Sequence, residues 1–103
     1  MNYKDYMQAT LDCISQVSEE TVEDFVSALR SVKEKGGRVF FLGVGGSAAN
    51  CSHAVNDFRK IGGIDALTPL DNVAELTAYI NDVSFEDCLV GSLKTSKLNE
   101  KDA

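Results

Sequence analysis

A glycine-rich turn and the histidine and aspartate that follow it are the residues of this sequence best suited to chemistry. The run Gly43-Val44-Gly45-Gly46-Ser47 lies between an apolar stretch and a helix-like pattern. Glycines let a ligand approach the backbone, and the first N–H groups of a helix have no partner within it. The turn therefore suits an anionic or hydroxyl-rich ligand. The alternative is that the glycines only make a tight strand-to-helix turn.

The helix expected over residues 47–61 carries a polar stripe and an apolar one. Asn50, His53 and Asp57 share the polar stripe. The apolar stripe faces the sheet and consists of Cys51, Val55, Phe58 and Gly62. His53 and Asp57 are one turn apart, which permits a hydrogen bond or joint coordination of a divalent metal. An ordinary surface histidine beside a helical carboxylate is the other interpretation.

Two helices are expected before the glycine turn and form an N-terminal pair. The first carries Tyr3, Tyr6, Met7, Leu11 and Ile14 at helical spacing. The second begins after Ser18, an N-cap residue followed by two glutamates that suit the positive end of the helix dipole. Its apolar stripe consists of Val22, Phe25, Val26, Leu29 and Val32.

The apolar run around the glycine turn predicts a parallel sheet. Residues Val39 to Leu42 are continuously apolar, which is typical of a buried central strand with helices on both faces. The segment Ile64 to Leu67 is a second strand candidate. Residues 38–67 then form a parallel strand–helix–strand unit, whose crossover is expected to be right-handed.

Two further helices are expected after the second strand. Their start signals are the pairs Asn72 with Glu75 and Ser84 with Asp87, and the last helix is expected to run through Leu98. Between the two helices lies Asn81-Asp82, for which a turn is the simplest interpretation.

Composition excludes several classes of protein. The chain has 103 residues, enough for one modest domain, and a net charge of -6, which argues against nucleic acid or an anionic membrane as partner. Cys13, Cys51 and Cys88 show no CxxC spacing, so neither a disulfide framework nor a four-cysteine zinc site is expected. Without an export signal or a long apolar run, the chain is expected to be soluble and cytoplasmic.

The runs GGRVFFLGVGGSAANCSHAVNDFRKIGG and DNVAELTAYINDVSFED resemble the sugar isomerase (SIS) domain family, and within it the sedoheptulose 7-phosphate isomerase, or phosphoheptose isomerase, group. The resemblance implies a single partial SIS domain over residues 1–103, with N-terminal helices in 1–35 and the first half of the sheet unit in 36–103. The implied fold class is α/β: a doubly wound parallel sheet in three αβα layers, truncated after about two strands.

The resemblance also implies a function. Members of this family interconvert aldose and ketose phosphates through an enediol, usually as homotetramers, so a phosphorylated sugar and further copies of this chain are the implied partners. By position, Gly45, Gly46 and Ser47 match residues that line the sugar chain, and Asn81 and Asp82 match a substrate-contacting turn.

The helical polar pair receives its roles from the same resemblance. Asp57 occupies the place of a glutamate that acts as catalytic base, and His53 matches a zinc ligand of some members, which makes zinc the candidate metal, with Asp57 as a second ligand. This sequence departs from the family in the shorter Asp57 and in Val44, where asparagine is common.

A larger departure lies at the end of the chain. The phosphate-binding loop and the second catalytic histidine of the family lie beyond Ala103, so the chain is expected to be a truncated isomerase domain. Two strands leave an open, apolar sheet edge, which predicts self-association, with the N-terminal helices as the expected contact.

Two alternative functions remain open at this point. One is a phosphosugar-binding SIS module without catalysis. It is favoured by the short side chain of Asp57 in place of the family's glutamate and by the expected lack of the second half of the domain. The other is a dinucleotide-binding oxidoreductase, because Gly43, Gly45 and Ala48 satisfy a loose GxGxxG/A spacing and Asp65 follows about 20 residues on. Asp65 falls near the start of its strand, whereas an acid that binds a ribose is expected at the carboxyl end of the strand.

Overall fold

A computed structural model describes residues 1–103. The helices and strands are, in order, α1 (Tyr3–Ser15), α2 (Glu19–Glu34), β1 (Arg38–Phe40), α3 (Gly46–Lys60), β2 (Asp65–Leu67), the 3-10 turn η1 (Pro69–Asp71), α4 (Val73–Asp82) and α5 (Cys88–Thr95). The chain forms two compact units, Met1–Arg30 and Ser31–Ala103. None of the helices is both long enough and apolar enough to cross a membrane.

Polar caps begin the two helices of the first unit. The Asn2 side chain accepts a hydrogen bond from the Asp5 N–H at 3.0 Å, and the Asp5 carboxylate accepts from the Asn2 N–H at 3.2 Å. The Ser18 hydroxyl accepts from the Thr21 N–H at 3.1 Å. The start of the second helix predicted at Ser18 is therefore confirmed, and each cap satisfies backbone donors that a helix leaves free.

The apolar stripes of the first unit are uncovered. No residue of α1 is buried. Its exposed apolar residues include Tyr3, Tyr6, Met7, Leu11 and Ile14, and those of α2 include Val22, Phe25 and Val26. On α2 only Val32, which belongs to the second unit, is buried. Both predicted helices are present, but the first unit by itself forms no buried core.

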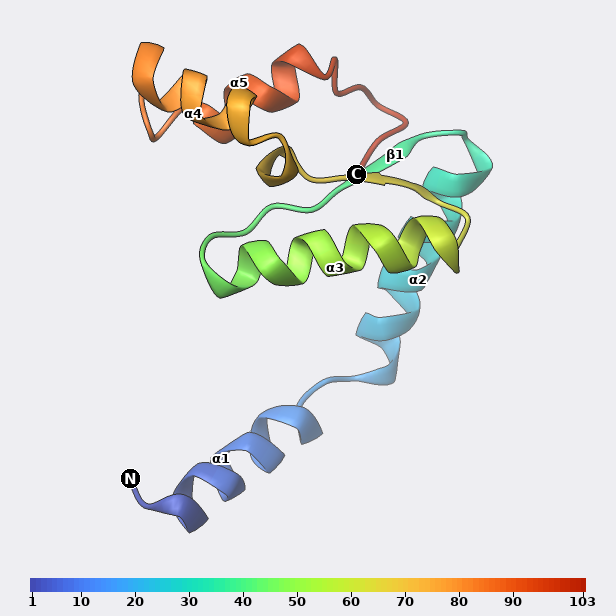
Figure 1. Cartoon of the computed structure of the whole chain (residues 1–103). Coiled ribbons are helices and arrows are strands. Elements are labelled where there is room, and N and C mark those ends of the chain that lie inside the picture. Colours follow the sequence, from blue (N-terminus) through green and yellow to red (C-terminus); the bar gives the residue numbers. More distant parts are fainter. The chain divides into compact units, whose positions relative to one another are not determined.

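The second unit is built on the predicted parallel pair of strands. β1 pairs with β2 in parallel, with Val39 opposite Ala66, and these two residues are 6% and 0% exposed. Figure 1 shows α3 on one side of the strands and α4 and α5 on the other. This unit thus has the three layers of an α/β arrangement around a small two-stranded sheet.

The first strand is shorter and less buried than expected. It ends at Phe40, and Leu42, predicted as part of a buried central strand, is 46% exposed. The reason is that β1 has one full partner strand, which pairs with residues 38–40. Burial of the whole apolar run requires strands along both edges.

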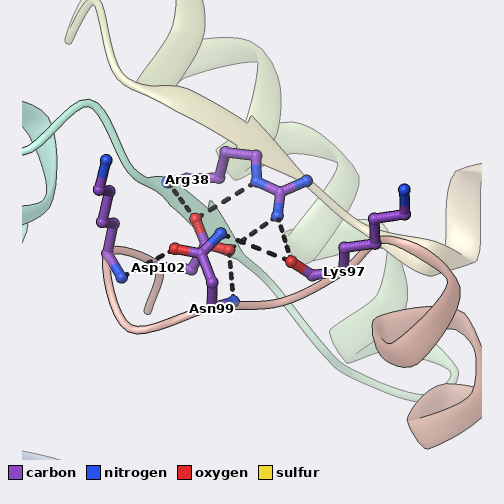
Figure 2. Close-up of polar contacts among 5 residues, drawn as sticks. Arg38, Lys97, Asn99 and Asp102 are labelled. Atoms are coloured by element: carbon purple, nitrogen blue, oxygen red, sulfur yellow. Dashed lines mark hydrogen bonds and ion pairs between the residues drawn. The ribbon is translucent and has the colours of Figure 1, made fainter.

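The other edge of β1 is occupied by the last two residues of the chain. The Ala103 N–H donates to the Arg38 carbonyl at 2.9 Å, and the Phe40 N–H donates to the Ala103 carbonyl at 2.7 Å. The Asp102 carboxylate accepts hydrogen bonds from three groups of Arg38: the backbone N–H at 2.8 Å, Nε at 3.3 Å and Nη2 at 2.8 Å (Figure 2). This ion pair fixes the C-terminal segment against the sheet.

The ion pair gives Asp102 an unusual acidity. Its side chain is 1% exposed, and the Arg38 guanidinium, as hydrogen-bond donor, lowers the pKa of Asp102 from 3.8 to about 2. Backbone N–H groups of Arg38 and Asn99 support the charged form as well. A pKa lowered by folding means that the charged carboxylate stabilises the folded state.

We expect Asp102→Asn to lower the free energy of unfolding by about 1–3 kcal/mol, because an amide replaces a charged acceptor of several hydrogen bonds. Since folding lowers this pKa, the stabilisation is complete above the unfolded value and is lost as the pH falls through about 2. Urea unfolding at several pH values should therefore show the difference between the two proteins shrinking from about pH 5 to about pH 2.

Glu100→Gln is the matched control, since Glu100 is an exposed acid of the same segment without a hydrogen bond or ion pair. Its unfolding free energy should stay within about 0.5 kcal/mol of the parent. An Asp102→Asn protein as stable as this control would contradict the role given to the ion pair.

We also expect the chain to self-associate at micromolar concentration through the apolar face of α1. Leu11→Asp places a charge on that face and should shift the molar mass measured by light scattering toward the monomer. Ala9→Asp adds the same charge on the opposite face of α1 and should leave the molar mass unchanged. A parent protein that is monomeric throughout this range would show the expectation to be wrong.

Candidate functional site

The glycine turn after β1 has a backbone that requires glycine at particular positions. Gly45 caps α3 with φ 63° and ψ -123°, a conformation that residues with a Cβ avoid. A Cβ on Gly43 would lie 2.7 Å from the Ser47 carbonyl carbon, so the chain can pass this closely only without a side chain. These two glycines set the path from the strand into the helix.

A cavity of about 540 Å³ opens beside this turn, past the carboxyl end of β1. Gly43, Val44, Gly45 and Ala48 form one wall. The opposite side consists mainly of apolar residues that include Leu70, Leu76, Ile80, Phe85 and Leu89. Glu86 is the one charged residue in the lining, and the Cys88 thiol, at 4% exposure of its residue, also contributes. The cavity is thus mainly apolar and lies where α/β folds bind ligands.

His53 and Asp57 lie close together on α3 but outside this cavity. His53 Nε2 is 3.1 Å from Asp57 Oδ2, and the two side chains are 77% and 45% exposed. The Asn56 side chain also donates to Asp57, at 3.2 Å. Zinc sites use three or four ligands, and no group of three or more His, Cys, Asp or Glu residues in this chain could hold a metal. The pair by itself thus offers fewer ligands than a zinc site uses.

The pair and the glycine turn are separated along the helix. Asp57 lies 11 residues after Gly46, the first residue of α3, and His53 lies seven residues after it. At 1.5 Å per residue these separations are about 16 Å and about 10 Å along the axis. The side chains lean toward the helix N-terminus, which shortens the gap by a few ångström. Only a long, extended ligand can contact the turn and the carboxylate of one chain together.

The predicted turn at Asn81-Asp82 is part of a helix. These are the last two residues of α4, and the Asn81 amide donates to the Asp82 carboxylate at 2.9 Å. The prediction of a turn was wrong because α4 continues past the apolar residues that signalled it. Ile80 lines the cavity together with Gly45, so the end of α4 and the glycine turn border one cavity.

Sequence reasoning missed the residues that shape this cavity from the far side. Glu86 and Cys88 carry no motif, and their place depends on how α5 packs. The Ser52 hydroxyl donates to the Asp71 carboxylate at 2.5 Å, which ties η1 to α3. No spacing rule relates residues 19 apart, so this contact had no signal in the sequence.

We expect Gly45→Ala to lower the free energy of unfolding by about 1–3 kcal/mol, because alanine is strained at φ 63° and ψ -123°. Gly46→Ala is the matched control at the next residue. Gly46 is helical and has open space around it, so alanine should leave stability unchanged or raise it by up to about 1 kcal/mol.

Thermal or urea unfolding of the two variants measures this difference directly. Equal stability of the Gly45→Ala and Gly46→Ala proteins would show that the turn has no need of a glycine conformation. In that case the path of the chain from β1 into α3 would have to differ from the one described.

Comparison with solved structures finds a similar fold. Phosphoheptose isomerase GmhA from Neisseria gonorrhoeae matches 97% of this chain with a TM-score of 0.82 and 21% sequence identity. This chain covers 53% of that protein, or about half of its length. No protein-family model matches the sequence, and no curated protein does. The likeness supports the truncated α/β fold expected from the sequence.

Proposed function

We propose that this chain binds a phosphorylated sugar and takes part in aldose–ketose isomerisation of the sedoheptulose 7-phosphate type. The observation that carries the proposal is the close approach of His53 Nε2 to Asp57 Oδ2, at 3.1 Å, on the helix that a glycine turn starts. The similarity of the fold to a phosphoheptose isomerase supports the proposed reaction class.

In this proposal Asp57 is the acid/base. Isomerisation moves a proton between adjacent carbons through an enediol, so one positioned group must take the proton and return it. Asp57 is 45% exposed, which leaves its carboxylate accessible to a ligand. His53, at 3.1 Å, orients the carboxylate and stabilises its charge when protonated.

The glycine turn holds the other end of the ligand. The N–H groups of Ser47 and Ala48 already bond to carbonyls of the turn, so the Gly46 N–H and the Ser47 hydroxyl are the donors that suit a phosphate or sugar hydroxyls. Asn81 and Asp82 follow the cavity residue Ile80 at the end of α4, but neither lines this cavity, and Asp82 lines a separate pocket. An open-chain heptose phosphate has the extended shape that the separation along α3 demands. Zinc held by His53 and Asp57, with the sugar's hydroxyls completing its coordination, would polarise the substrate carbonyl, and Asp57 would then be a ligand and not the acid/base.

A non-catalytic sugar-phosphate sensor is the second candidate. The observation that favours it is exposure: the His53 and Asp57 side chains are 77% and 45% exposed, whereas acid/base groups work best where water is excluded. Dinucleotide binding has less support, because Asp65 is the first residue of β2 rather than its last. An acid that binds a ribose lies at the carboxyl end of its strand.

Conversion of sedoheptulose 7-phosphate by the purified chain, followed by ³¹P NMR, tests the proposal. Asp57→Asn removes the proton acceptor while keeping the side-chain volume, so we expect kcat to fall by about 100-fold or more. The affinity for the sugar phosphate should stay within about twofold of that of the parent protein. Asp57→Glu should retain activity, because it keeps a carboxylate at this position.

Asp65→Asn is the matched control, since it neutralises an exposed carboxylate away from the proposed site and should leave turnover unchanged. Turnover by Asp57→Asn at the parent rate would show that Asp57 is an ordinary surface acid. Binding of the sugar phosphate without any turnover would favour the sensor instead.

A further inference from the structure

A second cavity, of about 530 Å³, lies between α3 and η1. Five of the residues that line it carry polar or charged groups, and we call it the polar cavity. It shares no lining residue with the cavity beside the glycine turn, although η1 borders both. Its lining consists of Ser52, Val55, Asn56, Arg59, Lys60 and Asp71.

One end of the polar cavity accepts hydrogen bonds. The Ser52 hydroxyl donates to the Asp71 carboxylate at 2.5 Å, which fixes η1 against the second turn of α3. The second oxygen of the carboxylate and the lone pairs of the hydroxyl remain as acceptors. Val55, which is 9% exposed, forms the apolar floor beside them. This end therefore suits a hydroxyl group of a ligand.

The other end of the polar cavity carries two positive charges. Arg59 and Lys60 are the last two residues of α3 and lie seven and eight residues after Ser52. These separations are about 10 Å and about 12 Å along the helix axis. Neither cation takes part in the two ion pairs formed within residues 1–103. In a chain of net charge -6, the two side chains make this end of the cavity locally positive.

Cations in the last turn of a helix can also serve only to offset the negative end of its dipole. In α3 other groups already do this. The N–H groups of Ile61 and Gly62 bond to the Asp57 carbonyl, at 2.8 Å and 3.2 Å. Lys33, from the last turn of α2, donates through Nζ to the Gly62 carbonyl at 2.8 Å. The charges of the two cations that line the cavity are thus available to a ligand.

Charge and geometry together select the class of ligand. A phosphate monoester carries about -1.5 to -2 charges at neutral pH, which two cations balance better than they balance a single carboxylate charge. A guanidinium such as that of Arg59 can donate two parallel hydrogen bonds to a phosphate. Asn56 lies between the two ends, and its amide has a second N–H besides the one that can bond to Asp57, at 3.2 Å.

We propose that the polar cavity binds a phosphate monoester that carries hydroxyl groups. Its phosphate lies against Arg59 and Lys60, and a hydroxyl several ångström away donates to Asp71. A divalent metal ion fits less well, because one carboxylate faces two positive charges. An uncharged sugar would leave both cations without a partner. The site is separate from the glycine turn and does not depend on the proposed isomerase function.

The test uses the full chain, labelled with ¹⁵N, and glycerol 3-phosphate as the probe. A salt concentration of about 0.15 M screens attraction over long distances. We expect the Asn56 side-chain amide and the Arg59 Nε–H to shift together along one saturable binding curve. Inorganic phosphate lacks the hydroxyl that donates to Asp71, so it should bind about tenfold more weakly.

Arg59→Gln removes one cation from the cavity and should weaken the binding of glycerol 3-phosphate at least about tenfold. Arg30→Gln is the matched control, because Arg30 is an exposed arginine of α2 that does not line the cavity. It should change the affinity by less than about twofold.

Asp71→Asn tests the other end of the cavity. The amide keeps an acceptor for Ser52 but loses the negative charge, so the preference for glycerol 3-phosphate over inorganic phosphate should fall from about tenfold to about threefold. Inorganic phosphate itself should bind this variant at least as tightly as the parent, because a like charge has been removed.

Three results would overturn the proposal. One is equal weakening by Arg59→Gln and Arg30→Gln, which would indicate general electrostatic attraction. Another is a Gly46 amide that shifts while the Asn56 side chain does not, because the probe would then bind at the glycine turn. The third is inorganic phosphate that binds the parent protein as tightly as glycerol 3-phosphate, since Asp71 would then have no part in recognition.

Discussion

Parallel pairing of β1 with β2 is the constraint on which the second unit depends. Two parallel strands cannot be joined by a tight turn, so the chain must cross over, and α3 makes that crossing. The same pairing brings the carboxyl ends of both strands to one edge. The glycine turn and the start of η1 consequently meet there, with Leu70 and Gly45 lining one cavity. The position of the candidate site thus follows from the parallel direction of the two strands.

Signals that act over a few residues were readable from the sequence. Ser18 and Asn72 cap their helices as predicted, with bonds to Thr21 and Glu75 at 3.1 Å each. The start of α3, the order of the elements and the parallel pair also followed from local patterns. Within the candidate site, the one-turn spacing of His53 and Asp57 suggested the contact that the structure contains. The caps and the His53–Asp57 contact depend on residues at most four apart, for which helix and cap geometry is known in advance. The parallel pair follows instead from two apolar runs separated by a helix-length segment.

Features that depend on residues far apart in the chain could not be read in this way. The cavity wall at Glu86, the bond between Ser52 and Asp71, and the pairing of Arg38 with Asp102 all join separate elements. The exposure of Leu42 has the same origin, because an apolar run shows what a strand can bury but not which neighbours are present. A polar stripe likewise shows which side chains share a face of a helix. It does not show that about 10 Å and about 16 Å of helix separate His53 and Asp57 from the turn.

The ion pair between Arg38 and Asp102 has a consequence for the order of folding. The two residues are 64 positions apart, so a ribosome completes β1, α3 and β2 long before it adds the aspartate. Contacts between distant residues also form late in refolding, because a long loop must close before they contribute. Throughout that interval the outer edge of β1 has no partner. A nascent chain is therefore most exposed to misassembly at this edge, and a chaperone that binds extended apolar segments would find one there.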